Sequence, residues 1–255
     1  MVLANAWDAA SARILESLGS PAVATTSAGV AFSEGYPDGE RISRDAMLAR
    51  VAQVTRVVRV PVTADLESGY GPTVDDAVAT ARGAIAAGAV GMNFEDGTPN
   101  GDGLYDANVQ AERIRAIRRA ADERGIALVI NARTDGFLKQ VGPQNARLEE
   151  ALRRGKLYRA AGADCIFVPG VDDRAEIEML ARNLDAPLNI LANAKTPSIA
   201  ELQRIGVARV SLGSGPYGIA YAAFRNAALE ARDSGTFTSS AARITHADLN
   251  ALFLK

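Results

Sequence analysis

The sequence predicts a single-domain α/β protein with a (β/α)8 barrel of the TIM type. The chain has 255 residues, the usual length of one such barrel. Helical stretches rich in Ala, Arg and Glu alternate with eight short apolar runs, and polar residues gather at the ends of those runs. An open, doubly wound sheet would alternate in the same way, but eight units in this length favour closure into a barrel.

The apolar runs are too short to be helices, and they are rich in Val, Ile and Phe. Such runs are typical of parallel strands that are buried on both faces. Four glycines stand where a helix C-cap requires a positive φ, namely Gly19, Gly88, Gly162 and Gly206. We expect a short helical tail from about residue 220 to complete the single domain over 1–255. The predicted strands cover residues 2–4, 22–27, 60–67, 90–96, 127–135, 164–170, 187–194 and 209–215.

The composition argues against several classes of partner. The formal net charge is −2 and the pI is about 5.6. No basic stripe interleaved with aromatic residues occurs, so we expect neither nucleic acid nor a membrane surface as a partner. The single cysteine, Cys165, excludes an internal disulfide and suits a reducing compartment. Without a signal peptide or an apolar stretch of about 18 residues, the protein is expected to be cytoplasmic.

Polar residues inside the predicted strands are informative because buried strands should be apolar. Side chains alternate along a strand, so residues two apart share a face. In the strand that contains VTADLE, the polar residues fall on one face and Val62, Ala64 and Leu66 on the other. The apolar face would pack on helices, while the polar face would line the barrel. The polar sets expected to point inward are Thr63, Asp65 and Glu67; Asn93 and Glu95; Asn131, Arg133 and Asp135; and Asn189 and Asn193.

Three of these residues, Asp65, Glu67 and Glu95, are carboxylates at the C-terminal ends of neighbouring strands. They would repel one another unless a positive charge lay between them. Mg²⁺ is the economical candidate, because it prefers oxygen ligands and keeps several waters. The alternative is a salt-bridge cluster centred on Arg133, which could neutralise at most one of the three charges. TIM-barrel active sites lie at this end of the strands, which favours the metal.

Other chemistries lack the residues they need. The only histidine, His246, lies near the C-terminus and is expected to begin or pack a helix, so a zinc site or a Ser-His-Asp triad is incomplete. Cys165 stands at the start of its strand, opposite the active end, and is expected to be a core residue. GSGPYG (213–218) matches a dinucleotide-binding pattern, but no later strand follows it. A tight turn into the last barrel helix is the better interpretation, although an anion site remains open.

Five stretches together resemble the isocitrate lyase/phosphoenolpyruvate mutase superfamily: NAWDAASARILE, ATTSAGVAFSEGYPDG, PVTADLESGYG, NFEDG and NARTDGFL. They occur in the family's order and cover most of the chain up to about residue 215. The resemblance implies Mg²⁺, with Mn²⁺ as an alternative, and a small 2-oxo or 2-hydroxy carboxylic acid that passes through a metal-bound enolate. It also implies a homo-oligomer, a dimer or a tetramer, because many members exchange a C-terminal helix between subunits.

The resemblance also implies roles for individual residues. Asp65 would hold the metal directly or nearly so, while Asp38, Glu67 and Glu95 would bind its waters. The turn formed by Thr26, Ser27 and Ala28 would hold the substrate carboxylate, with Asn193 as a further substrate-binding residue. Arg133 would contact that carboxylate or the developing enolate, and Asn100 would stand near the asparagine of the mutases.

Differences between this sequence and the family's motifs narrow the set of reactions that we expect. The loop GTPNGDGLYD (97–106) contains neither the Cys and His of the isocitrate and methylisocitrate lyases nor the Lys of the mutases. Pro169 stands where the phosphonate enzymes carry a histidine. We therefore expect carbon–carbon cleavage, by decarboxylation or retro-aldol reaction, with decarboxylation of oxaloacetate-like acids least dependent on a loop acid. Phosphoenolpyruvate mutase or phosphonopyruvate hydrolase chemistry is an alternative, and so is a protein that binds a 2-oxo acid without turnover. The loop could be a mobile lid or a plain surface loop.

Overall fold

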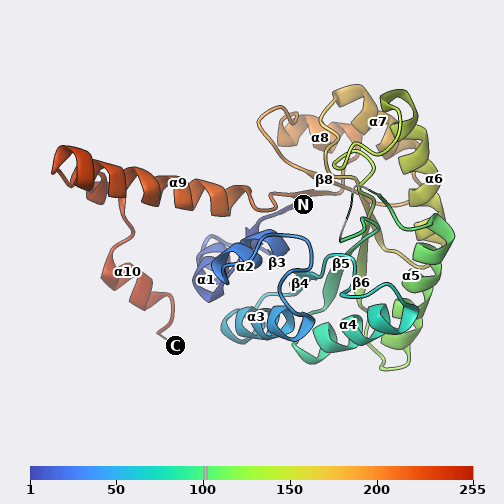
Figure 1. The fold of residues 1–255 in the computed structure, drawn as a ribbon, viewed down its shortest axis with the longest axis horizontal. Coiled ribbons are helices and arrows are strands. Elements are labelled where there is room, and N and C mark those ends of the chain that lie inside the picture. The colour runs from blue at the N-terminus through green and yellow to red at the C-terminus, as the bar shows by residue number, and fades with distance from the viewer. Residues whose placement is uncertain (100, 102, 255) are drawn as a thin grey trace.

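A computed structural model describes residues 1–99, 101 and 103–254, and it has parallel strands surrounded by helices (Figure 1). Each predicted apolar run contains a strand, and every strand is shorter than the run that predicted it. The first run contains one strand, and a second short strand that the sequence analysis did not predict follows it after Ala4. The strands are β1 (Val2–Leu3), β2 (Asn5–Ala6), β3 (Val23–Thr25), β4 (Val62–Asp65), β5 (Gly91–Glu95), β6 (Val129–Arg133), β7 (Cys165–Phe167), β8 (Leu188–Leu191) and β9 (Arg209–Ser211).

The two short strands at the N-terminus close the barrel. All strand pairs are parallel, and the order in the sheet is β1-β9-β8-β7-β6-β5-β4-β3-β2. On one side Val2 of β1 pairs with Val210 of β9, and on the other Asn5 of β2 pairs with Ala24 of β3. The chain from β1 to β2 therefore connects β9 on one side to β3 on the other. The structure confirms the (β/α)8 barrel over the open sheet.

Side chains along the strands alternate between the barrel interior and the surrounding helices, as predicted. In and just after β4, Val62, Ala64 and Leu66 are at most 3% exposed and belong to apolar clusters. Thr63 and Asp65 point the other way and line a cavity inside the barrel. The pleat of a strand imposes this separation. The barrel interior can thus carry polar chemistry while the helices pack on an apolar layer.

The helices begin and end where local signals predict. The four glycines expected at C-caps all have positive φ, between 81° and 109°. Asp8 and Thr73 each form a capping box at the start of a helix. The α-helices are α1 (Ala9–Ser17), α2 (Ser27–Ser33), α3 (Arg44–Val57), α4 (Val74–Ala86), α5 (Ala107–Asp122), α6 (Arg147–Ala160), α7 (Arg174–Asn183), α8 (Ile199–Ile205), α9 (Gly215–Leu229) and α10 (His246–Ala251). Short turns of other helix types are η1 (Gln144–Ala146), η2 (Glu230–Ser234) and η3 (Thr238–Ala242).

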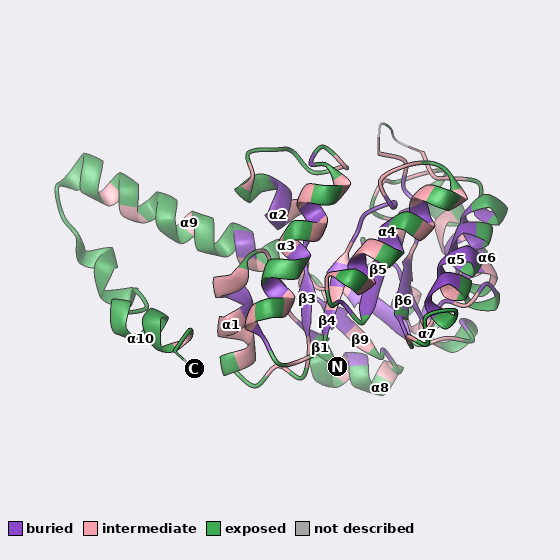
Figure 2. Cartoon of the chain, turned by 90° about the horizontal axis from the view of Figure 1, so that it is seen from below, coloured by how far each residue is buried: buried purple, intermediate pink, exposed green. Residues whose placement is uncertain are grey.

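The helix α9 does not pack on the barrel, contrary to the expectation for the segment after GSGPYG. The tight turn is present, with Gly213 at φ 54°, but the helix then projects away from the barrel (Figures 1 and 2). Only Tyr217 of α9 is buried, while Ile219 and Phe224 are more than 70% exposed. Ile219 and Phe224 therefore have no apolar partner within the described part of this chain. None of the helices described is long and apolar enough to span a bilayer.

Candidate active site

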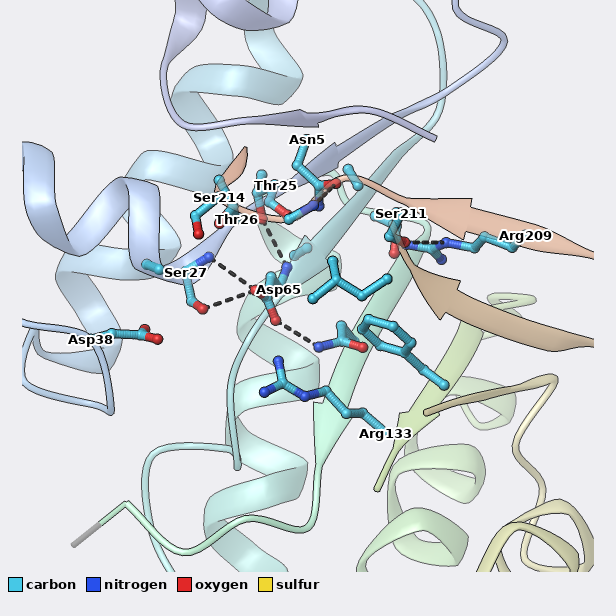
Figure 3. A pocket seen from close by; sticks show the side chains of 18 of the residues that line it. Asn5, Thr25, Thr26, Ser27, Asp38, Asp65, Arg133, Arg209, Ser211 and Ser214 are labelled. Carbon is cyan, nitrogen blue, oxygen red and sulfur yellow. Dashed lines mark hydrogen bonds between the residues drawn. The ribbon is translucent and has the colours of Figure 1, made fainter. Parts of the chain in front are cut away.

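A polar cavity of about 200 Å³ opens at the C-terminal ends of the strands and is called the upper cavity here (Figure 3). Side chains from most strands of the barrel line it, among them Asp65 of β4, Asn93 of β5 and Arg133 of β6. An adjoining cavity of about 180 Å³ is lined by Glu67 and Glu95. The two cavities share Ser27, Asp38, Leu138 and Arg133. The structure thus brings together the carboxylates and the arginine that the sequence predicted.

Asp65 is held entirely by neutral donors. The backbone N–H and Oγ of Ser27 donate to its Oδ2 at 3.0 and 2.9 Å, and Asn93 Nδ2 donates to its Oδ1 at 2.7 Å. Its own N–H donates to Thr25 Oγ1 at 2.8 Å. These contacts fix both carboxylate oxygens at the cavity wall. None of them supplies a full positive charge.

Glu67 follows the end of β4 in a strained backbone conformation. Its φ is 50°, a region that residues other than glycine rarely adopt and that often marks functional sites. The carboxylate accepts from the N–H of Glu40 at 2.5 Å and from the Tyr70 hydroxyl at 3.1 Å. Burial, then the negative charges of Asp38 and Asp65, raise the pKa of Glu67 to about 8. The site therefore holds a desolvated carboxyl group that forms no ion pair with a cationic side chain among the described residues.

Arg133 forms the core of a salt-bridge cluster with two carboxylates. Its Nη1 lies 2.9 Å from Glu95 Oε2, and its Nε lies 2.6 Å from Asp135 Oδ1. Burial alone would lower the pKa of Arg133, but Glu95 and Asp135 raise it, so the guanidinium stays charged. Burial raises the pKa of Glu95 even though Arg133 opposes the shift. The salt-bridge cluster that was the alternative to a metal therefore exists. It pairs Arg133 with Glu95 and Asp135, and within the described part of the chain Asp65 and Glu67 form no ion pair.

The donor set suits a hard divalent cation held largely through water. Asp38 lines both cavities, and burial, then Asp65, raises its pKa. Burial first, and then repulsion by neighbouring carboxylates, raises the pKa values of Asp38, Glu67 and Glu95, and a bound cation would favour their charged forms. Within residues 1–99, 101 and 103–254, no three His, Cys, Asp or Glu side chains converge as direct ligands. Mg²⁺ commonly keeps several waters and takes only one or two carboxylates, so the arrangement fits it without a protein cage.

The predicted carboxylate-binding turn lies against the upper cavity. Thr26, Ser27 and Ala28 all line it, and Thr26 is the N-cap of α2. A Cβ on Gly29 would lie 2.8 Å from Thr26 Cγ2, so glycine permits the close packing of this turn. Both donors of Ser27 are used by Asp65. A ligand carboxylate would therefore contact Thr26 and Ala28, or compete with Asp65 for Ser27.

Two predicted site residues are not placed in the cavities. Asn193 is exposed: β8 ends at Leu191, and the side chain turns to accept from the Lys195 N–H at 2.7 Å and donate to Asp172 at 3.3 Å. The prediction that it shares an inward face with Asn189 was wrong, because strand alternation does not continue past the strand. Asn189 is fully buried and bonds Ser211. Asn100 lies outside the described residues.

The sequence analysis missed two cationic residues. Lys139, in the loop after β6, lines the adjoining cavity, and its Nζ donates to the carbonyls of Thr98 at 2.8 Å and Gly101 at 3.3 Å. Lys139 lies outside the loop 97–106, where the resemblance places the lysine of the mutases. Arg209 begins β9 and lines the upper cavity with Ser211. The same two-residue alternation that identified the other polar faces would have found it.

Cys165 and His246 are both distant from this site. Cys165 is 7% exposed and lines an apolar cavity of about 320 Å³ at the opposite end of the strands, called the lower cavity. Burial raises its pKa to about 11, so the thiol is unreactive. His246 is the exposed first residue of α10. Both sequence predictions are confirmed.

Comparison with known proteins identifies the family. The phosphoenolpyruvate phosphomutase family model matches residues 1–232. Two crystal structures from Burkholderia cenocepacia J2315 are similar. One is a candidate lyase/mutase with TM-score 0.92 and 39% identity, and the match covers 99% of this chain and 91% of the other. The other is a candidate phosphonomutase with TM-score 0.85 and 42% identity, and the match covers 88% of this chain and 92% of the other.

A named enzyme is also similar over most of the chain. Oxaloacetate decarboxylase 1 of Pseudomonas fluorescens (strain Pf0-1) is 30% identical over 253 residues, which cover 95% of this chain and 84% of that protein. The barrel, the inward carboxylates and these matches agree. The chain belongs to the phosphoenolpyruvate phosphomutase family, within the isocitrate lyase/phosphoenolpyruvate mutase superfamily.

Proposed function

We propose that this protein is a Mg²⁺-dependent carbon–carbon lyase that acts on a small 2-oxo or 2-hydroxy carboxylic acid and leaves an enolate. The observation that carries the proposal is the grouping of Asp65, Glu67 and Asp38 beside a charged Arg133. None of these three carboxylates forms an ion pair with any residue that the structure describes. A binding module or structural protein would gain nothing from such costly buried charges. The similarity to a decarboxylase supports the same reaction class.

The residues of this chain have distinct parts in the proposed reaction. Thr26 and Ala28 hold the carboxylate on C1 of the substrate. Arg133, oriented by Glu95 and Asp135, donates to the oxygen on C2 as negative charge grows there. When bound by Asp65, and through water by Asp38, Glu67 and Glu95, Mg²⁺ would supply a Lewis acid at that oxygen. Mn²⁺ would bind to the same donor set in place of Mg²⁺.

Decarboxylation of oxaloacetate illustrates which bond breaks and where the electron pair and the proton go. The bond between C3 and C4 breaks, CO₂ leaves, and the electron pair moves to the enolate of pyruvate. Water then protonates C3. Neither Cys165 nor His246 lines the upper cavity. The pKa of Arg133 is raised, so its guanidinium does not release a proton. Decarboxylation is therefore the cleavage expected to be fastest, because it relies least on an acid supplied by the protein.

A substrate screen at fixed Mg²⁺ tests the proposal. The compounds are oxaloacetate, dimethylmalate, isocitrate, methylisocitrate and phosphonopyruvate. We expect pyruvate release from oxaloacetate to be fastest and glyoxylate release from isocitrate to be weak. Robust glyoxylate release would overturn the predicted order of the substrates. Mg²⁺-dependent binding of these acids without any turnover would favour a binding protein.

Phosphorus–carbon bond chemistry is the second candidate. It is favoured by the family match, by the similarity to a candidate phosphonomutase, and by Lys139, whose ammonium contacts the loop after β5 from the neighbouring loop. A lysine placed there could serve the part that the mutases give to a loop lysine. Turnover of phosphonopyruvate that exceeds that of oxaloacetate, and that falls in Lys139→Met, would establish this function instead.

A further inference from the structure

A second guanidinium faces the upper cavity from inside the barrel. Arg209 and Ser211 share the inward face of β9, and Arg209 Nε donates to Ser211 Oγ at 3.3 Å (Figure 3). Arg209 and Thr63 line both the upper and the lower cavity. The two side chains therefore form the partition between the cavities, which is the floor of the upper one.

The charge of Arg209 has no partner among the described residues. No carboxylate forms an ion pair with it, whereas Arg133 and Arg154 each pair with two carboxylates. The buried Arg113 instead donates to two backbone carbonyls and a glutamine. Burial lowers the pKa of Arg209, and at neutral pH, where the Cys165 thiol is uncharged, the negative charge of Asp65 opposes that shift. A half-buried cation without a partner is costly, and a bound anion would relieve the cost.

Polar groups beside Arg209 point to a carboxylate as that anion. Thr63 Oγ1 is buried and has no hydrogen-bond partner among the described residues, although a hydroxyl normally finds one. Ser211 supplies a second hydroxyl at the floor; it donates to Asn189 Oδ1 at 3.2 Å and would exchange this partner for a ligand carboxylate. A guanidinium with two hydroxyls can satisfy both oxygens of a carboxylate. The lower cavity offers mainly apolar walls, so the upper cavity is the better place for this group.

We propose that Arg209, with Ser211 and Thr63, binds a second carboxylate of the substrate, at the end opposite the 2-oxo acid group. The inference rests on the proposed function, which places the first carboxylate at Thr26 and Ala28. Arg209 then selects four- and five-carbon dicarboxylates over monocarboxylates of the same length. Its contribution is to binding, because a carboxylate that leaves as CO₂ loses its attraction to the guanidinium in the transition state.

Matched ligands test this selection. 2-Oxoglutarate and 2-oxovalerate have the same chain length, and a methyl group replaces the distal carboxylate in the second. Calorimetry with Mg²⁺ should show 2-oxoglutarate to bind about 10- to 100-fold more tightly, as expected for charge-assisted hydrogen bonds. Arg209→Met should abolish this preference and leave oxalate binding unchanged. Arg209→Lys should restore part of it, and Arg204→Met, which removes an exposed arginine from α8, should change nothing.

Two further readouts separate a binding residue from a structural one. Arg209→Met should keep its melting temperature, since a charge without a partner stabilises nothing. With oxaloacetate it should raise KM without lowering kcat. The inference is overturned if wild type does not distinguish the two ligands, if Arg209→Met still does, or if kcat falls while KM is unchanged. Failure of wild type to bind oxalate in a Mg²⁺-dependent way would instead refute the proposed function itself.

Discussion

Asp65 and Glu67 lie two residues apart, yet their surroundings differ. Asp65 accepts three hydrogen bonds from neutral groups at the wall of the upper cavity. Glu67 is 3% exposed and is held beyond the strand end by a positive φ. Alternation predicted that both point inward. It could not predict the strained backbone at Glu67, which depends on contacts with Glu40 and Tyr70 from elsewhere in the chain.

Asp65→Ala should abolish turnover and leave the fold intact. The variant loses the carboxylate nearest to the proposed metal, and we expect activity to fall by about 100-fold or more. The free energy of unfolding should change little, because relief of repulsion with Asp38 and Glu67 offsets the lost hydrogen bonds. Activity assays and urea unfolding measure both effects, with the exposed Asp185→Ala as control. Retained turnover would remove Asp65 from the metal site.

Glu67 should make the metal-free protein less stable as pH rises. With its pKa raised from 4.5 to about 8, the folded protein binds this proton more tightly than the unfolded one. Unfolding then releases the proton between these values, so the contribution to stability is present at low pH and is lost as pH rises through that window. Urea unfolding with a chelator at pH 5 and pH 8 should show the loss, and Glu67→Gln should reduce it. Equal profiles for Glu67→Gln and wild type would contradict the raised pKa.

Among the secondary-structure elements, the sequence predicted the strands best where apolar and polar residues alternate clearly. All eight runs contain strands, and the inward faces of β4, β5 and β6 are those predicted. The errors fall at element ends. The alternation was extended past β8 to Asn193. The predicted N-terminal run ended at Ala4 and missed β2, which forms because this segment pairs with β3 as well as with β9. Hydrogen-bond partners distant in sequence decide such boundaries.

The position of Cys165 tests the placement of β7. The thiol lies at the lower cavity, and its strand begins there. Cys165→Ser should leave kcat/KM unchanged and cost about 1–3 kcal/mol of stability, because a hydroxyl replaces a thiol in an apolar environment. Steady-state kinetics and thermal unfolding measure the two effects. Loss of turnover in a well-folded variant would place this strand end near the active site and contradict the fold described.

At the scale of the whole molecule, α9 is the feature that the barrel does not explain. Tyr217 stacks on Tyr221 and packs edge-on against Trp7, which anchors the start of the helix. Ile219 and Phe224 stay exposed. No pattern within the chain could reveal this, because an apolar helix face looks the same whether its partner is the barrel or another subunit. We propose that one barrel domain with this extension assembles as a homo-oligomer.

Phe224→Asp should convert the proposed dimer or tetramer to monomer. A charge in an apolar contact is costly, so the assembly should weaken while the barrel remains folded. Light scattering after size-exclusion chromatography measures the mass. Met179→Asp, at an exposed apolar position on α7, serves as the control and should not change it. A wild-type protein that is monomeric at micromolar concentration would contradict the proposal.

Calorimetry with and without Mg²⁺ tests the proposed site, with oxalate as an analogue of the enolate of a 2-oxo acid. We propose that Asp65, Glu67, Glu95 and Asp38 bind a divalent cation, which together with Arg133 binds the acid. Oxalate should therefore bind in the presence of Mg²⁺ and lose nearly all affinity after exhaustive chelation. Asp65→Ala should bind it weakly under both conditions. Equal affinity of the wild-type protein with Mg²⁺ and with chelator would contradict the claim.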